Sequence, residues 1–78
     1  MPIGGSSVSI EVVLTTRMDE ASSTITYVGE ASIGTSSASA AWRIKRITTS
    51  GTQTIIEWAD GNNNFDNIWD NRASLSYS

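Results

Sequence analysis

The chain contains neither cysteine nor histidine among its 78 residues, and this double absence most constrains how it can fold. A domain of this size buries only about 60% of the surface that its unfolded chain exposes, so small domains usually need disulfides, a metal or association with other chains. Disulfides are excluded, and zinc is disfavoured because carboxylates alone rarely hold it. Calcium or assembly with other chains remain as expected sources of stability.

The same absence removes the commonest catalytic side chains. Without His or Cys there is no Ser-His-Asp triad, no thiol nucleophile and no imidazole base. Asp66 and Asp70 have the i,i+4 spacing of neighbours on a helical turn, but so short a chain leaves little room for a substrate cleft. We therefore predict that the protein is not an enzyme, with this pair as the catalytic alternative.

Charge and hydropathy limit the partners. The net charge is −3, and a chain this acidic is a poor general binder of nucleic acid. No apolar run approaches the roughly 20 residues needed to span a membrane. The start, MPIGGSSVSI, lacks the basic region and apolar stretch of a secretory signal. We expect a protein that is made in a cytoplasm and stays soluble there, without a membrane or specific nucleic-acid partner.

Short bursts of β-branched residues between Ser/Thr-rich connections predict a mainly β domain. Alternating apolar and polar residues predict strands over residues 8–16, 24–31, 40–48 and 54–58. A polar turn is expected over 17–23, a loop over 31–39 and a hairpin turn around Gly51. Gly29 is expected to end the second strand or to mark a bulge, and Arg43 or Lys45 to face Glu57 across the hairpin.

After Trp58 the pattern changes to a helical period. Phe65, Ile68, Trp69 and Arg72 are spaced i, i+3, i+4, i+7, which predicts about two helical turns capped by Asn64. A last strand is expected over 73–77. The expected fold is one domain over residues 1–78, a small β-sandwich or barrel of four to five strands with one short helical turn before the last strand. The predicted core consists of Trp42, Ile44, Ile56, Trp58, Phe65, Ile68, Trp69 and Leu75.

The stretch EWADGNNNFDNIWDNR, from Glu57 to Arg72, contains a candidate calcium loop. Its oxygen-bearing side chains alternate as in the first half of an EF-hand, but the sixth position is Phe65 instead of glycine and the twelfth is Asn71 instead of an acid. A calcium-stabilised binding domain therefore stays an alternative, and side chains that shape a turn are the favoured interpretation. The candidate ligands are Asp60, Asn62, Asn64 and Asp66.

Two further patterns suggest contacts with other molecules. Trp58, Trp69 and Tyr77 could stack on a sugar of a host-surface glycan, although aromatic side chains in a small domain are more often core because each buries about 150–250 Å². The basic stripe Arg43, Lys45 and Arg46 is either a solvated strand face or a contact with an acidic neighbour in an assembly.

Four segments together resemble a family of short proteins encoded among the virion genes of tailed bacteriophages. They are YVGEASIGT from Tyr27, AWRIKRI from Ala41, the stretch from Glu57 to Arg72, and SLSY from Ser74. They match the frame Y-V/I-G-x-A, W-x-I-x-K/R-I, W/Y-A-D-G and F-x-x-V/I-W-D-x-R-x-x-L-x-Y. The match covers about two-thirds of the chain, from Tyr27 to Tyr77, and leaves the first 26 residues outside the frame.

The resemblance implies a structural or tail-associated virion component without catalytic residues or cofactors. Its expected partners are other virion proteins and copies of itself, and its expected location is the virion, at the capsid surface, neck, tail or fibre. Subunits in such assemblies gain stability from their neighbours, which suits a small domain. Residues 1–7 are the predicted docking arm, with Pro2 and Ile3 as contact residues. A glycan-binding module of a phage receptor-binding apparatus is the alternative function.

Overall fold

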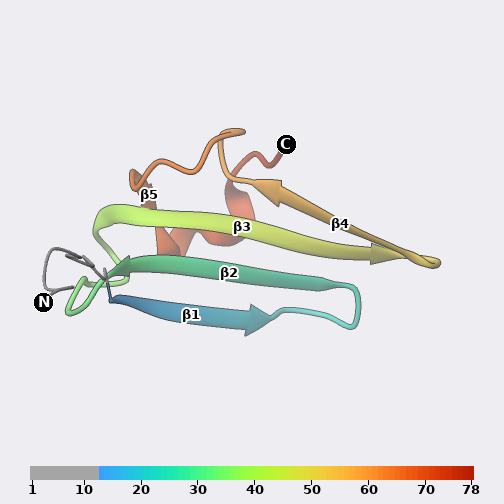
Figure 1. Ribbon diagram of the computed structural model, residues 1–78, viewed down its shortest axis with the longest axis horizontal. Helices are drawn as coiled ribbons and strands as arrows, with labels where there is room; N and C mark the ends of the chain where they lie inside the picture. Colours follow the sequence, from blue (N-terminus) through green and yellow to red (C-terminus); the bar gives the residue numbers. More distant parts are fainter. Residues whose placement is uncertain (1–12) are drawn as a thin grey trace, which may run out of the picture.

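The computed structural model describes residues 13–78, which form an antiparallel sheet followed by a short 3-10 helix (Figure 1). The strands follow the order β1-β2-β3-β4, and β5 pairs with β3 beside the start of that strand. The mainly β fold class, with five strands and a short helical element near the C-terminus, is confirmed. The elements are β1 (Leu14–Glu20), β2 (Ile25–Ser32), β3 (Ala40–Ser50), β4 (Gln53–Trp58), β5 (Asn67–Ile68) and the 3-10 helix η2 (Trp69–Ser74).

The four described strands of the main sheet do not form the expected sandwich or barrel. They make one open sheet, in which β1 and β4 are the two outer strands of the described residues. Helix η2 and the C-terminal segment pack against one face in place of a second sheet, and we call this the covered face. Its buried residues are Tyr27, Ala31, Trp42, Ile44, Ala59 and Trp69, with Ile25, Leu75 and Tyr77 packed around them.

Strand β1 extends further than the sequence predicts. The expected polar turn over residues 17–23 is wrong, because β1 stays paired with β2 up to the contact of Glu20 with Thr26. Two polar side chains find partners on the covered face, which keeps this part extended: Arg17 lies 5.7 Å from the centroid of the Trp42 ring, and Asp19 pairs with Arg72. Residues 8–12 of the predicted first strand lie outside the described residues.

Gly29 neither ends β2 nor forms a bulge. It pairs in regular register with Arg17 on one side and with Ile44 on the other. Its role is to make room for tryptophan, because a Cβ atom at this position would lie 2.5 Å from Cε3 of Trp69. The glycine expected to interrupt the strand therefore marks a position where η2 approaches the sheet closely.

The helical prediction after Trp58 is wrong in its bounds. Helix η2 begins at Trp69, its N-cap position is Ile68 instead of Asn64, and no side chain caps it. Asn67 and Ile68 pair with β3 instead, and the backbone N–H of Asp70 donates to the carbonyl of Ser37, so tertiary pairing replaces the first predicted turn. The predicted last strand is also wrong, since only the bridge between Ala59 and Tyr77 forms.

Four of the eight predicted core residues neither belong to the core cluster nor pack against it: Ile56, Trp58, Phe65 and Ile68. Ile56 is 56% exposed because its side chain points away from η2, and Phe65 is 45% exposed because it lies in the loop before β5. Trp42 and Ile44 are fully buried and Trp69 is 5% exposed. Leu75 is half-buried against the core, whereas Ile68 is half-buried in β5 and Trp58 is half-buried on the sheet face opposite η2.

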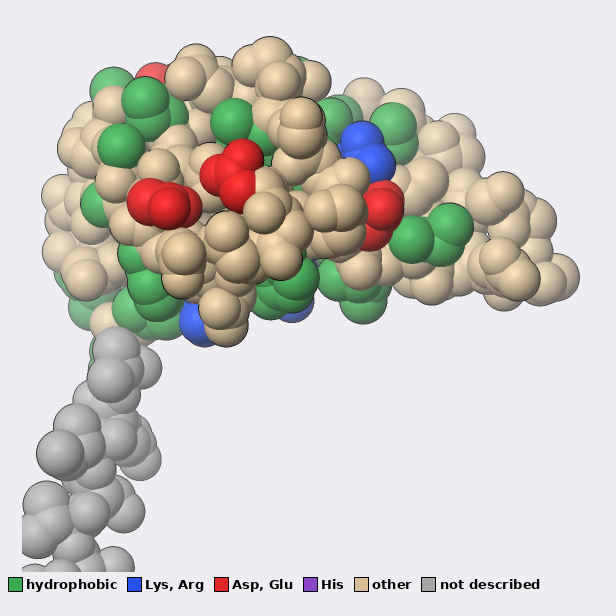
Figure 2. Space-filling model, turned by 90° about the horizontal axis from the view of Figure 1, so that it is seen from above, with side chains coloured by type: hydrophobic (Ala, Val, Ile, Leu, Met, Phe, Trp, Pro, Cys, Tyr) green, Lys and Arg blue, Asp and Glu red, His purple; other side chains and the backbone are tan. Residues whose placement is uncertain are grey.

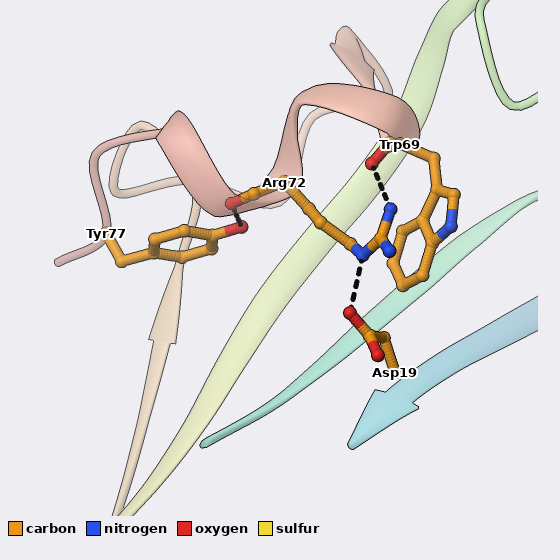
Figure 3. Close-up of polar contacts among 4 residues, drawn as sticks. All are labelled: Asp19, Trp69, Arg72 and Tyr77. Carbon is orange, nitrogen blue, oxygen red and sulfur yellow. Dashed lines mark hydrogen bonds and ion pairs between the residues drawn. The ribbon is translucent and has the colours of Figure 1, made fainter. Parts of the chain in front are cut away.

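Arg72 fastens η2 to the sheet (Figure 3). Its Nε donates to Oδ2 of Asp19 over 2.9 Å, and its Nη1 donates to the carbonyl of Trp69 over 3.2 Å. The guanidinium lies 4.6 Å from the centroid of the Trp69 ring. The backbone carbonyl of Arg72 accepts a hydrogen bond of 2.8 Å from the hydroxyl of Tyr77. One arginine thus connects β1, the buried indole and the C-terminal segment.

Stability is expected to fall at alkaline pH because of Tyr77. Burial, and secondarily the neighbouring Tyr27, raise the pKa of Tyr77 from 10.0 to about 12. In this window the unfolded chain loses the phenolic proton while the folded protein keeps it, so the folded state is favoured fully below pH 10 and progressively less towards pH 12. The melting temperature should therefore drop with pH across this window. It should drop less in Tyr77→Phe, which keeps the ring, and equal slopes in the two proteins would contradict the assignment.

Candidate functional site

The second face of the sheet, which we call the open face, carries the candidate functional site. Side chains alternate along β3, so Arg43, Lys45 and Ile47 lie on the face opposite Trp42 and Ile44. Residues directly opposite one another in the register share a face, which assigns the residues of the neighbouring strands. No described element packs on this face except the loop residue Phe65. Its other side chains are Leu14, Thr16, Met18 and Glu20 of β1, Thr26, Val28, Glu30 and Ser32 of β2, Thr49 of β3, and Thr54, Ile56 and Trp58 of β4.

Cations and aromatic rings gather at the centre of the open face. The guanidinium of Arg43 lies 4.8 Å from the Phe65 ring centroid and 6.0 Å from that of Trp58, and Nζ of Lys45 lies 5.5 Å from Trp58. Each such contact is worth about 0.5–1 kcal/mol at an exposed site. We call Arg43, Lys45, Trp58 and Phe65 the aromatic–basic cluster.

Glu30 neutralises only one of the two cations. Its Oε1 accepts a hydrogen bond of 2.8 Å from Nε of Arg43 on the neighbouring strand. Lys45 makes no ion pair with any described residue, so its ammonium is available to a partner. The cluster therefore combines apolar ring surface with one positive charge that no residue of 13–78 neutralises.

The open face suits a broad contact better than a small ligand. No pocket is present in the part of the chain that the structure describes, and Met18, Ile56 and Phe65 are all more than 40% exposed. Trp and Arg are the side chains most enriched where protein contacts contribute most binding energy. The arrangement can therefore bind a flat surface that is apolar and carries an acidic group.

The basic stripe that the sequence predicts is divided between the two faces. Arg43 and Lys45 lie on the open face, whereas Arg46 lies on the covered face with its guanidinium 4.8 Å from the Tyr77 ring centroid. Arg46 is also the residue opposite Glu57, and its Nη2 donates to Oε1 of that residue over 3.0 Å. The expected pairing of Glu57 with Arg43 or Lys45 is therefore wrong, because the register places those residues on the opposite face.

The candidate calcium ligands shape the turn after β4. Asp60 adopts a left-handed conformation with φ of 60°, followed by Gly61 with φ of 69°. Oδ1 of Asn62 accepts from the backbone N–H of Asn64, and Nδ2 of Asn62 donates to the carbonyl of Asp60. No group of three or more acidic side chains suitable for a metal occurs within residues 13–78. These hydrogen bonds are those of a turn stabilised by asparagine side chains.

Asp66 and Asp70 do not lie on a shared helical turn. Asp66 precedes β5, and its Oδ1 accepts from the side chain of Asn67, whereas Asp70 lies in η2. The i,i+4 spacing would bring these two carboxylates together only on a helix that begins before Asp66. Because η2 begins at Trp69, it contains Asp70 but not Asp66, and the predicted catalytic pair is not formed on a helix.

The proposed sugar platform is also divided. Trp58 is half-buried on the open face, whereas Trp69 is buried against Gly29 on the covered face. Tyr77 packs on Tyr27, with ring centroids 5.8 Å apart, and so lies on the covered face as well. The three aromatic residues therefore cannot stack on one sugar.

Sequence reasoning missed the partnership of Phe65 with Arg43. The sequence did indicate that an apolar side chain is exposed on this sheet. Ile55 and Ile56 are adjacent, and a strand with only one covered face must expose one of them. The predicted docking arm over residues 1–7, including Pro2 and Ile3, lies outside the described residues.

Comparison of the chain with protein-family models, with curated proteins and with solved structures finds no match. Among residues 13–78 there is also no helix whose length and hydropathy would let it span a bilayer.

Proposed function

We propose that this chain is a non-enzymatic structural subunit of a tailed-bacteriophage virion, at the tail, neck, fibre or capsid surface, and that it docks on neighbouring virion proteins through its open face. The observation that carries this proposal is an entire sheet face without a packing layer among the described residues. Exposed apolar residues and the aromatic–basic cluster occupy that face. The sequence frame supplies the virion context.

The structural roles of the frame residues support a packing function. Trp42 and Trp69 are in contact in the core, with ring centroids 5.9 Å apart, and Gly29 admits Trp69 to the sheet. Arg72 and Tyr77 fasten η2 and the C-terminal segment through hydrogen bonds. A frame that specifies packing residues suits a subunit whose task is to present a surface.

The docking chemistry follows from the cluster. A partner that covers Trp58 and Phe65 would remove apolar surface from water at about 25 cal/mol per Å². An acidic side chain on the partner would pair with Lys45, which lacks an ionic partner among the described residues. Exclusion of water from the rings would strengthen that pair, as at the centre of other protein interfaces.

Substitution of Phe65 tests the proposal in particles of a phage that encodes this chain. Phe65→Ser removes an exposed ring from the cluster, and the number of copies per purified particle should fall at least about tenfold if the ring contributes as a central contact residue. Ile33→Ser is the matched control, because Ile33 is 70% exposed in the loop after β2 and lies outside the cluster.

Quantitative mass spectrometry of salt-washed particles gives the copy number. Incorporation of the control at the unsubstituted level together with loss of Phe65→Ser would support docking through the open face. Absence of the unsubstituted chain from particles would overturn the virion assignment. Equal incorporation of both variants would overturn the assignment of the docking face.

A further inference from the structure

The free edge of β4 has a limited length. Figure 1 shows β4 at the edge of the sheet, with the C-terminus beside its end and the hairpin tip away from it. At one end, Ser78 makes two backbone hydrogen bonds with Trp58, from each N–H to the other residue's carbonyl. At the other end, the chain turns at Gly51, whose φ is 61°. The edge between these limits runs over residues 53–57.

The hydrogen bonds of Trp58 show which backbone groups on this edge point outward. In an antiparallel pair, alternate residues of a strand bond to the same neighbour, and the intervening residues direct their N–H and C=O groups to the other side. The backbone groups of Trp58 bond outward to Ser78, so the backbone N–H and C=O groups of Ile56 and Thr54 also point outward, away from β3. Their backbone groups have no partner among the described residues.

The side chains of this edge lack the usual protection against pairing. Residues 53–56, Gln-Thr-Ile-Ile, contain no charge and no proline, and these are the features that discourage edge-to-edge association. Ile55 is 40% exposed on the covered face, beyond η2, and Ile56 is 56% exposed on the open face. Figure 2 shows no Lys, Arg, Asp or Glu side chain at the tip of the projecting part of the molecule, and hydrophobic side chains behind that tip. Both sides of the strand are therefore apolar where the backbone is free.

We infer that the β4 edge binds the β4 edge of a second copy of this chain, antiparallel, with Ile55 opposite Ile55 at a two-fold axis. In this register Thr54 lies opposite the partner's Ile56, so the outward backbone groups of the two chains meet and form about four hydrogen bonds. The free segment is centred on Ile55, which makes it self-complementary, as a two-fold interface requires.

Other registers use the edge less well. If the register shifts by one residue, the outward N–H and C=O groups of one chain face residues of the other chain whose own backbone groups already bond to β3. A shift by two residues centres the pair on Ile56 or Thr54. The first of these brings Thr54 opposite the partner's blocked Trp58, and the second brings Ile56 opposite the turn residue Thr52. Only the register centred on Ile55 pairs every free outward group.

The same register accounts for both exposed isoleucines. Ile55 meets its own copy as a directly opposite pair on the covered face, where side chains of non-hydrogen-bonded pairs lie closest. Ile56 lies diagonal to its own copy on the open face, within reach of a long side chain. The pair would join two sheets into one and leave both aromatic–basic clusters on the same continuous face. The inference concerns the free chain in solution and stands independently of the virion proposal.

Cysteine scanning tests the register, because the chain contains no cysteine of its own. Directly opposite Cα atoms in a non-hydrogen-bonded pair are about 4.5 Å apart, within the range of a disulfide. Under mild oxidation, full-length Ile55→Cys should therefore form a covalent dimer at least about tenfold faster than Ile33→Cys, an exposed loop control. Fastest crosslinking at Thr54→Cys or Ile56→Cys would overturn this register.

Sedimentation of the full chain over a range of concentrations tests association without crosslinking. The unsubstituted chain should show a monomer–dimer equilibrium, which Ile56→Lys should weaken at least about tenfold by setting lysines near each other across the axis. Ile33→Lys adds the same charge outside the edge and should leave the equilibrium unchanged. Thr54→Pro removes one outward donor without touching the ladder with β3, and it should also weaken the dimer.

Circular dichroism establishes that each variant keeps its strands. A chain that stays monomeric at every concentration would overturn the inference, and so would equal weakening by the Ile56 and Ile33 variants. Since these measurements need no phage particle, their failure is distinguishable from failure of the virion proposal.

Discussion

Trp42→Ala is expected to remove much of the free energy of unfolding of the domain. Trp42 is fully buried, its ring lies 5.9 Å from that of Trp69, and its Nε1 donates to the carbonyl of Ser36 over 2.9 Å. Truncating a buried tryptophan costs about 3–5 kcal/mol, and the carbonyl also loses its donor. A domain of this length has only about 4–12 kcal/mol of stability in total, so one truncation removes much of it. Urea unfolding followed by far-UV circular dichroism measures the loss.

Trp58→Ala is the matched control for this prediction. Trp58 is the same residue type on the neighbouring strand, but it is half-buried on the open face and keeps Lys45 over its ring. Its truncation removes less buried surface and leaves no closed cavity, so the expected loss is about 1–2 kcal/mol. Equal losses in the two variants would contradict the assignment of the core to the covered face.

The parts of the fold that the sequence predicts are those set by local period. Strand β3 alternates Trp42 and Ile44 with Arg43 and Lys45, and the structure places the two sets on opposite faces as predicted. The hairpin around Gly51 also forms where it is expected, because a glycine with positive φ fits its two-residue turn. Both features depend on neighbours in sequence.

The sequence predictions that were wrong concern elements whose structure depends on contacts between residues far apart in the sequence. The spacing of Phe65, Ile68, Trp69 and Arg72 satisfies a helical period, yet Ile68 pairs with Ala40 on β3. Backbone pairing with an existing strand edge satisfies the N–H and C=O groups as well as a helical turn does, so local period does not decide between them. The start of η2 at Trp69 therefore follows from the pairing of Asn67 and Ile68 with β3.

The candidate site was only partly accessible to sequence reasoning, for the same reason. Arg43 and Lys45 follow from strand period, but Phe65 joins them through a loop whose path depends on the turn at Asp60 and Gly61. The basic stripe also loses Arg46 to the covered face, where it pairs with Glu57. Alternation indicates which residues share a face, but it does not indicate which of the two faces stays open.

Gly29→Ala is expected to destabilise the domain by about 3 kcal/mol, near the upper end for overpacking. Replacing a glycine by alanine within a strand would ordinarily recover about 0.5–1 kcal/mol of backbone entropy. Here the added Cβ would lie 2.5 Å from Cε3 and 2.7 Å from Cζ3 of Trp69, and 3.2 Å from Cε3 of Trp42. The steric term is the larger because neither indole can move away easily: Trp42 is fully buried, and Trp69 begins the helix that Arg72 fastens to β1.

A double-mutant cycle with Trp69→Phe isolates that steric term. Both clashing atoms of Trp69 belong to the fused benzo ring of its indole, and phenylalanine has no atoms at the Cε3 and Cζ3 positions. Gly29→Ala should therefore cost at least about 1–2 kcal/mol less in the Trp69→Phe background. Gly34→Ala supplies the control. Its φ of 88° strains an alanine, but its Cβ would meet nothing within 4 Å, so its cost should be the same in both backgrounds. An unchanged cost of Gly29→Ala after removal of the indole would show that the glycine is required by its backbone, and the close approach of η2 to β2 would then not explain this position.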